Sequence, residues 1–180
     1  SFGIEKGDRV GVWAPNCPEW TMLQYATAKI GAILVTINPA YRTHELAYVL
    51  RHSAVRLLVS ATEFKNSDYR AMVAEVRPEL PDLAEVLFLG TEDWKRFGER
   101  AALVPAAELR RRAESLTPGD AINIQYTSGT TGAPKGATLS HRNILNNGYF
   151  VTDLIGFGPG DRLCIPVPFY HCFGMVMGNL

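Results

Sequence analysis

The sequence has few cysteines, and they are not spaced to cross-link the chain. Three occur among the 180 residues, Cys17, Cys164 and Cys172, and none forms a C-x-x-C pair. An odd number of cysteines without that spacing favours reduced thiols in a cytosol-like compartment over a disulfide framework. The chain is long enough to be stabilised by one sizeable hydrophobic core instead.

An excess of either charge is also absent. The chain has 18 Lys and Arg against 18 Asp and Glu, so its formal net charge is zero. No overall field then favours nucleic acid or an anionic membrane, and any phosphate binding must be local. Neither a signal-peptide pattern nor an apolar run near the roughly 20 residues of a membrane span occurs. The expected compartment is the cytoplasm, with the mitochondrial matrix as the alternative in a eukaryote.

What the chain does contain is an alternation of strand-like and helix-like segments. Runs rich in Val, Ile and Leu predict buried strands at residues 9–14, 32–38, 55–61, 85–90 and 121–127. Apolar residues at helical spacing predict helices at 19–31, 44–53, 67–80, 105–116 and 141–156, with Thr43 and Ser140 as caps. Strands separated by helices imply right-handed crossovers. We therefore expect a three-layer α/β fold with a mostly parallel sheet flanked by helices, and a single short helix between residues 91 and 120.

The segment Thr127–Gly136 has no aliphatic side chain larger than alanine or proline, so it cannot fill a core. It offers glycines, hydroxyl groups and one ammonium group. Its residues are Thr127, Ser128, Gly129, Thr130, Thr131, Gly132, Ala133, Pro134, Lys135 and Gly136. A predicted strand precedes it and a predicted helix follows Ser140, and this arrangement presents backbone N–H groups to an anion.

Lys135 and Pro134 distinguish this segment from a surface linker rich in small residues. A lysine about 4 Å from a phosphate charge gains on the order of 4 kcal/mol before desolvation, at an effective dielectric of about 20. Proline stiffens the loop, so less entropy is lost when a ligand binds. The Walker pattern fails at both neighbours of Lys135, and the spacing of Gly129 and Gly132 does not fit G-x-G-x-x-G. The segment is thus predicted to bind phosphate in another way, with the Thr127 hydroxyl as a candidate Mg²⁺ ligand.

A second segment, Pro166–Gly174, sets His171 among aromatic residues. On composition alone, such a histidine is either a hydrogen-bonded core residue or a functional one. Cys172 is its neighbour, but a Cys–His nucleophile is not expected because adjacent side chains usually point apart and no third group is identifiable to orient them.

At these two segments the chain resembles the AMP-forming adenylating superfamily, which includes the acyl-CoA synthetases. Residues 126–136, Y-T-S-G-T-T-G-A-P-K-G, match the phosphate loop of that family, with Ala133 at its variable position. Residues 166–174 are similar to its P-x-F-x-H-x-x-G segment. The stretches "GDRVGVWAPNCPEW", "AKIGAILVTINPAY" and "ELAYVL" resemble the opening domain of the fatty-acyl branch, near the medium-chain ligases.

The resemblance implies an acid–thiol ligase that works in two half-reactions. A fatty acid would first react with ATP and Mg²⁺ to give an acyl-adenylate and pyrophosphate, and coenzyme A would then displace AMP. It assigns Thr127–Lys135 to nucleotide binding and Thr127 to Mg²⁺. It gives catalytic roles to Lys135 and His171, with Phe169, Tyr170 and His171 in the substrate pocket.

The resemblance covers essentially all 180 residues, about a third of the usual length of the family. The expectation is a partial N-terminal AMP-binding domain, residues 1–180, without the C-terminal domain, and inactive or weakly binding by itself. Two alternatives stay open: adenylation of an aryl or amino acid, and a non-catalytic nucleotide-binding or interaction module. The oligomeric state is open too, a homo-oligomer included.

Overall fold

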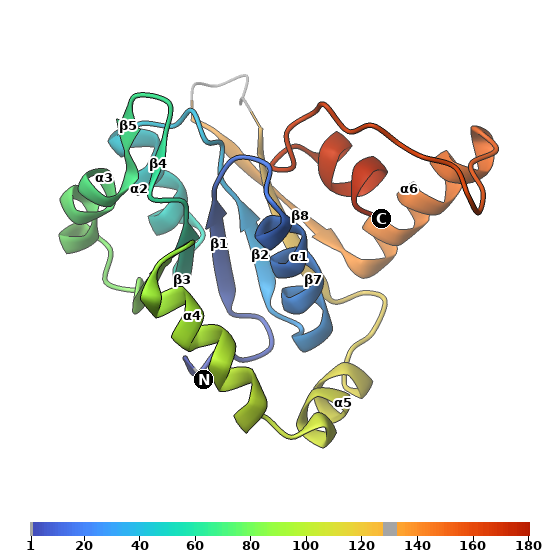
Figure 1. The fold of residues 1–180 in the computed structure, drawn as a ribbon, viewed down its shortest axis with the longest axis horizontal. Coiled ribbons are helices and arrows are strands. Elements are labelled where there is room, and N and C mark those ends of the chain that lie inside the picture. The colour runs from blue at the N-terminus through green and yellow to red at the C-terminus, as the bar shows by residue number, and fades with distance from the viewer. Residues whose placement is uncertain (1, 128–132) are drawn as a thin grey trace.

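The computed structural model describes residues 2–127 and 133–180, and their main feature is a six-stranded sheet (Figure 1). Its strand order is β6-β3-β1-β2-β7-β8. The strands are β1 (Arg9–Trp13), β2 (Ile33–Thr36), β3 (Val55–Ser60), β6 (Glu85–Phe88), β7 (Ala121–Thr127) and β8 (Lys135–Ser140). All neighbouring pairs are parallel except β7 and β8, which are antiparallel. The expected α/β fold with a mostly parallel sheet is confirmed, and each of the five predicted strands is present.

Helices cover both faces of the sheet (Figure 1). The α-helices of the described residues are α1 (Pro18–Ile30), α2 (Thr43–His52), α3 (Tyr69–Val76), α4 (Glu92–Glu99), α5 (Ala106–Glu114) and α6 (His141–Leu154). Helices α1, α4 and α6 pack on one face, called here the front, and α2 and α3 pack on the back. The chain thus forms the three layers that the alternating sequence predicts.

The two faces bury separate apolar clusters, because side chains of a strand alternate between faces. Trp20 of α1 and Leu34 of β2 belong to the front cluster. Trp13 of β1 belongs to the back cluster and stacks on Tyr69 with ring centroids 3.5 Å apart. The Trp13 indole N–H also donates to the carbonyl oxygen of Asn38 at 3.1 Å, so this buried aromatic residue has no unpaired donor.

Residues 63–68 and 91–120 contain elements that the sequence did not predict. Residues 91–120 contain two α-helices, since α4 precedes α5 and is capped by the hydroxyl of Thr91, which accepts from Trp94 N–H at 3.3 Å. Helix α4 was not predicted because most of its residues are charged. Its apolar side consists of Trp94 and Phe97, which pack on the front cluster. Residues 63–68 also form a small hairpin of β4 (Glu63–Phe64) and β5 (Ser67–Asp68).

Helix α2 begins one residue earlier than expected. Thr43 is its first residue rather than its cap, and Arg42 occupies the capping position. The carboxylate of Glu45 accepts a hydrogen bond from Arg42 N–H at 3.1 Å, which satisfies one amide at the helix start. Within the described ranges, we find no helix with the length and apolar character needed to cross a bilayer.

Replacing Leu58 by alanine tests the packing of the back layer. Leu58 lies in β3, is fully buried and contacts the back cluster. The truncation leaves a cavity, so the free energy of unfolding should fall by about 2–5 kcal/mol in urea titrations followed by tryptophan fluorescence. Met22→Ala is the control, because Met22 is 65% exposed on α1, and it should change stability by less than about 0.5 kcal/mol. Equal losses in the two variants would contradict the assignment of the core.

Candidate functional site

The candidate site lies at the carboxyl edge of the parallel strands. After β1 the chain enters α1 on the front, whereas after β2 it enters α2 on the back. Neighbouring strands whose connections leave to opposite faces open a crevice at their carboxyl ends, the usual ligand site of such sheets. Strand β7 pairs with β2 and ends at Thr127, so the predicted phosphate loop starts at this edge.

The two ends of the phosphate loop are joined by the pairing of β7 with β8. Thr127, the last residue of β7, pairs with Lys135, the first residue of β8. Paired residues in an antiparallel ladder have Cα atoms about 4.5–5.5 Å apart, so the loop is closed at its base. Both residues are exposed, and Lys135 makes no ion pair with any residue in the ranges 2–127 and 133–180. Ser128, Gly129, Thr130, Thr131 and Gly132 lie outside the described residues.

The expected order of strand, loop and helix is wrong, because a strand follows the loop. Strand β8 runs back along β7, and Ser140 pairs with Ala121 at the amino end of β7. Helix α6 therefore begins at the opposite edge of the sheet. Ser140 does cap it, since its hydroxyl accepts from Asn143 N–H at 3.3 Å. The partial positive charge at the start of α6 acts only within a turn or so and cannot reach a ligand at the loop.

The second predicted segment is fastened to the same edge by Asn16, which follows β1. The Asn16 amide donates to the carbonyl oxygen of Val167 at 2.9 Å and its oxygen accepts from Phe169 N–H at 2.8 Å. Phe169 also packs on Trp20 of α1, with ring centroids 5.8 Å apart. The two hydrogen bonds of Asn16 and the ring contact of Phe169 all join residues far apart in the sequence. They therefore set the position of the segment relative to β1.

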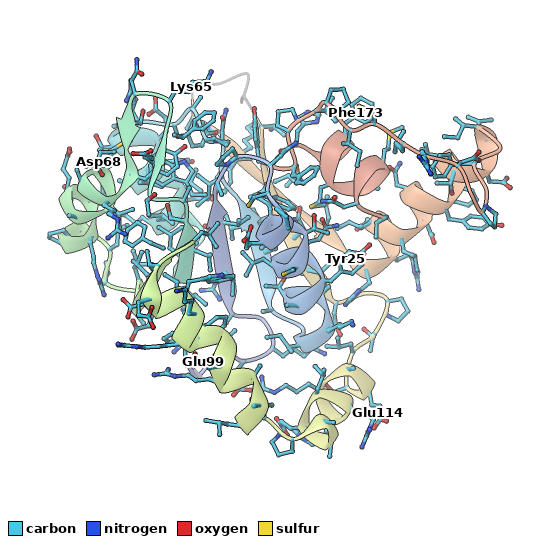
Figure 2. All side chains as sticks on the ribbon, in the orientation of Figure 1. Tyr25, Lys65, Asp68, Glu99, Glu114 and Phe173 are labelled. Atoms are coloured by element: carbon cyan, nitrogen blue, oxygen red, sulfur yellow. The ribbon has the colours of Figure 1, made fainter. Side chains whose placement is uncertain are left out.

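A π-helix, η3 (Phe173–Gly178), continues the segment over the front of β7. Met175 is 1% exposed, and its sulfur lies 3.4 Å from the amide nitrogen of Gln125 in β7. Its backbone carbonyl accepts from the Gln24 amide at 3.1 Å. Figure 2 places Phe173 at the same end of the molecule as Lys65, which lies on the β4–β5 hairpin after the carboxyl end of β3.

His171 is exposed, so it is not a core histidine. Its Nδ1 accepts a hydrogen bond from Phe173 N–H at 3.2 Å. A neutral imidazole whose Nδ1 accepts must carry its proton on Nε2, and from this contact we assign the Nε2–H tautomer. The ring is then a hydrogen-bond donor at its far nitrogen, suited to an anionic oxygen.

Cys172 and His171 do not point apart, contrary to expectation. The Cys172 sulfur lies 3.7 Å from His171 Nδ1. Nδ1 is already the acceptor for Phe173 N–H, so its lone pair is not free to take the thiol proton. The geometry gives no support to a Cys–His nucleophile.

Tyr170 acts electrostatically on Tyr41, a residue that the sequence did not single out. Burial raises the pKa of the Tyr41 phenol, and the nearby Tyr170 phenol raises it further. Tyr41 follows β2, so its position also belongs to the carboxyl edge. Asn16 was missed as well, although an Asn directly after a strand in a Pro15-Asn16 turn is a signal that could have found it.

A cavity of about 750 Å³ lies elsewhere. It is lined from α1, α5 and α6, with Leu34, Ile122 and Met175 among its walls. None of the predicted site residues that the structure describes lines this cavity, so it is separate from the candidate site.

Comparison with known proteins points to one family. The sequence pattern of the family described as AMP-binding enzyme matches residues 1–180. Medium-chain acyl-CoA ligase ACSF2, mitochondrial, from Danio rerio is 41% identical over 198 residues, covering 99% of this chain and 33% of the relative. The chain thus spans about a third of the length of that curated relative.

Two solved structures are similar in fold. A long-chain-fatty-acid-CoA ligase (FadD1) from Archaeoglobus fulgidus has a TM-score of 0.74 at 28% identity, covering 97% of this chain and 33% of that one. ATP-bound MatB from Rhodopseudomonas palustris has a TM-score of 0.73 at 26% identity, covering 99% of this chain and 33% of that one.

The packing of the second segment can be tested at Gly174. A Cβ atom there would meet the backbone of Pro168, with the carbonyl carbon at 2.8 Å and Phe169 N at 3.1 Å. Gly174→Ala should therefore displace the turn that carries His171 and lower the free energy of unfolding by about 1–3 kcal/mol. Hydrogen exchange of the Phe169 amide, bonded to Asn16, should become faster.

Gly158→Ala is the matched control, because a Cβ atom at Gly158 meets nothing within 4 Å. It should leave both the stability and the Phe169 exchange rate as in the wild type. Unchanged exchange in Gly174→Ala would show that the turn is not packed as described.

Proposed function

The chain belongs to the AMP-binding enzyme family, and we propose that it carries the nucleotide-phosphate site of an acid–thiol ligase. In the first step, a carboxylate oxygen forms a bond to the α-phosphorus of ATP while the bond to pyrophosphate breaks, giving an acyl-adenylate. In the second step, the sulfur of coenzyme A, after losing its proton, attacks the acyl carbon and AMP leaves. The product is an acyl-CoA thioester.

One observation carries this proposal: Thr127 and Lys135 are paired and exposed at the carboxyl edge, where Asn16 also fastens the His171 segment. In nucleotidyl transfer, the protein contributes mainly by positioning the reacting groups and by stabilising charge. Lys135 would hold the negative charge that accumulates on the departing pyrophosphate. The Nε2–H of His171 would donate to the carboxylate or to an α-phosphate oxygen and orient them.

Magnesium would arrive with ATP as part of the substrate. The described residues contain no group of three or more His, Cys, Asp or Glu side chains that could bind a metal. A single hydroxyl such as that of Thr127, exposed at the end of β7, fits an ion that takes its other ligands from phosphates and water. We therefore assign to Thr127 one contact to Mg²⁺, and none of the steps above depends on a protein-bound metal.

We propose a fatty acid as the substrate, with Phe169 and Tyr170 walling its pocket. Phe169 is half-buried against Trp20, so it offers an apolar wall next to the His171 turn. The name of the Danio rerio relative, a medium-chain acyl-CoA ligase, supports the same substrate class. Pyrophosphate exchange with a panel of fatty, aryl and amino acids tests this, and a preference for aryl or amino acids would contradict it.

The compartment and assembly stay predictions. We place the protein in the cytoplasm, or in the mitochondrial matrix if the organism is a eukaryote, as the name of the Danio rerio relative states for that protein. Light scattering on the purified protein would decide between a monomer and a homo-oligomer.

Lys135→Ala tests the role of the ammonium group in the complete enzyme. Removing one positive charge from the pyrophosphate site should slow adenylate formation by one to three decades, roughly 1.4–4 kcal/mol. Acid-dependent exchange of pyrophosphate into ATP measures this step. Lys95→Ala is the control, because Lys95 is an exposed lysine on α4, and it should exchange at the wild-type rate. Wild-type exchange in Lys135→Ala would rule out the proposed role.

His171→Ala tests the histidine separately. If Nε2–H orients the carboxylate and the α-phosphate, the first half-reaction should lose more rate than the second. Exchange of pyrophosphate reports the first, and thioester formation from preformed adenylate reports the second. His44→Ala removes an exposed histidine of α2 and should affect neither. A selective loss of thioester formation in His171→Ala would count against the assignment.

A further inference from the structure

Three side-chain rings on the back of the sheet lie next to residues 134–136. These residues form the end of the predicted phosphate loop that leads into β8, and they are called here the arm. Tyr48 and His52 come from α2, one turn apart, and Tyr126 comes from β7. The Tyr48 and His52 rings stack with centroids 5.3 Å apart and an interplanar angle of 16°. The Tyr126 ring meets both edge-on, with centroids 6.4 Å from Tyr48 and 5.8 Å from His52.

Hydrogen bonds tie this cluster to the loop. The Tyr48 hydroxyl donates to the carbonyl oxygen of Pro134 at 3.0 Å. The Tyr126 hydroxyl lies 2.7 Å from Nδ1 of His52, which fixes the orientation of the ring that Tyr48 stacks on. Burial raises the pKa of the Tyr126 phenol, so this hydroxyl stays protonated at neutral pH. His52 is exposed, yet it takes part in this contact.

Gly136 allows the ring of Tyr126 to pack against the same arm. The two residues are paired across β7 and β8. A Cβ atom at Gly136 would lie 3.4 Å from Cζ of Tyr126 and only 3.0 Å from Cγ2 of Ile124. A larger residue would therefore push the arm off the ring, and the arm is held between the ladder and the aromatic cluster.

These contacts act on the peptide group that precedes Lys135. The ring of Pro134 fixes its own φ angle, and the Tyr48 hydroxyl fixes the direction of its carbonyl oxygen. The peptide plane between Pro134 and Lys135 then has little freedom. Because Lys135 is also paired with Thr127 in the ladder, its Cα–Cβ bond points in one direction. Positioning of this kind matters because a misplacement of about 1 Å at a reacting group can cost on the order of 100-fold in rate.

We propose that Tyr48 is a positioning residue for Lys135: through the carbonyl oxygen of Pro134 it aims the ammonium group at the nucleotide phosphates. The inference rests on the proposed nucleotide site. Tyr48 touches no reacting group itself. Its hydroxyl acts from α2, 86 positions before Pro134 in the sequence.

Tyr48→Phe in the complete enzyme is the direct test, because it keeps the stacked ring and removes one hydroxyl. A single hydrogen bond contributes enough to expect a rise in the KM for ATP of about three- to ten-fold. The KM values for the acid and for coenzyme A should stay within about two-fold, since neither is held by Lys135.

Tyr69→Phe is a matched control. The Tyr69 hydroxyl also donates to a proline carbonyl, and Tyr69 is buried on the same face, but this proline is Pro39, which lies between β2 and α2. It should lower the melting temperature by a similar amount and leave the KM for ATP unchanged. If both variants change the KM for ATP alike, or neither does, Tyr48 is a structural residue only.

A double-mutant cycle separates this inference from the proposed function. Titration with ATP and Mg²⁺ gives the Kd for the wild type, Tyr48→Phe, Lys135→Ala and the double variant. If Tyr48 acts through Lys135, removing its hydroxyl should change the Kd in the wild type but not in the Lys135→Ala background. Equal effects in the two backgrounds would overturn the positioning role, whereas a wild-type Kd in Lys135→Ala would overturn the nucleotide site itself.

Discussion

The pairing of Thr127 with Lys135 at the end of the β7–β8 ladder is the constraint on which the candidate site depends. The ladder brings the last residue of a buried strand next to the only lysine of the loop. Strand β7 itself runs parallel to β2 and pairs with it at three positions. The base of the loop therefore has the rigidity of the sheet, and a ligand at the loop would meet groups whose positions are already set.

Two distant parts of the chain hold β7 from opposite faces near this base. On the front, Gln125 contacts Met175, so the position of β7 and that of the His171 segment are linked. On the back, Tyr126 contacts His52 of α2. Because neighbouring residues of a strand point to opposite faces, a single dipeptide can join both layers. Lys135 and His171 would thus be placed on one frame, which a reaction between a phosphate and a carboxylate requires.

The sequence predicted the parallel strands and drew attention to both candidate segments, because these signals are local. Buried strands are continuous apolar runs, and the loop has a composition that no core position tolerates. It did not predict β8, since no residue of Lys135–Ser140 is buried and its strand conformation comes from pairing with β7. The turn signal at Asn16 could not show which segment Asn16 binds, and no local signal marked Tyr48. Both contacts join residues more than 80 positions apart, at separations of 151 and 86. The assumption that α6 starts at the loop failed for the same reason.

The most direct test of this account is an NMR titration of the chain with ATP and Mg²⁺, following backbone amide shifts. Binding at the carboxyl edge should change the amide chemical shifts of Thr127, Lys135, Gly136 and His171. The amide chemical shifts of Leu34 and Ile122, which line the front cavity, should not change. Shifts confined to the front cavity, or to the edge where α6 begins, would contradict the claim that the β7–β8 ladder holds a polyphosphate site.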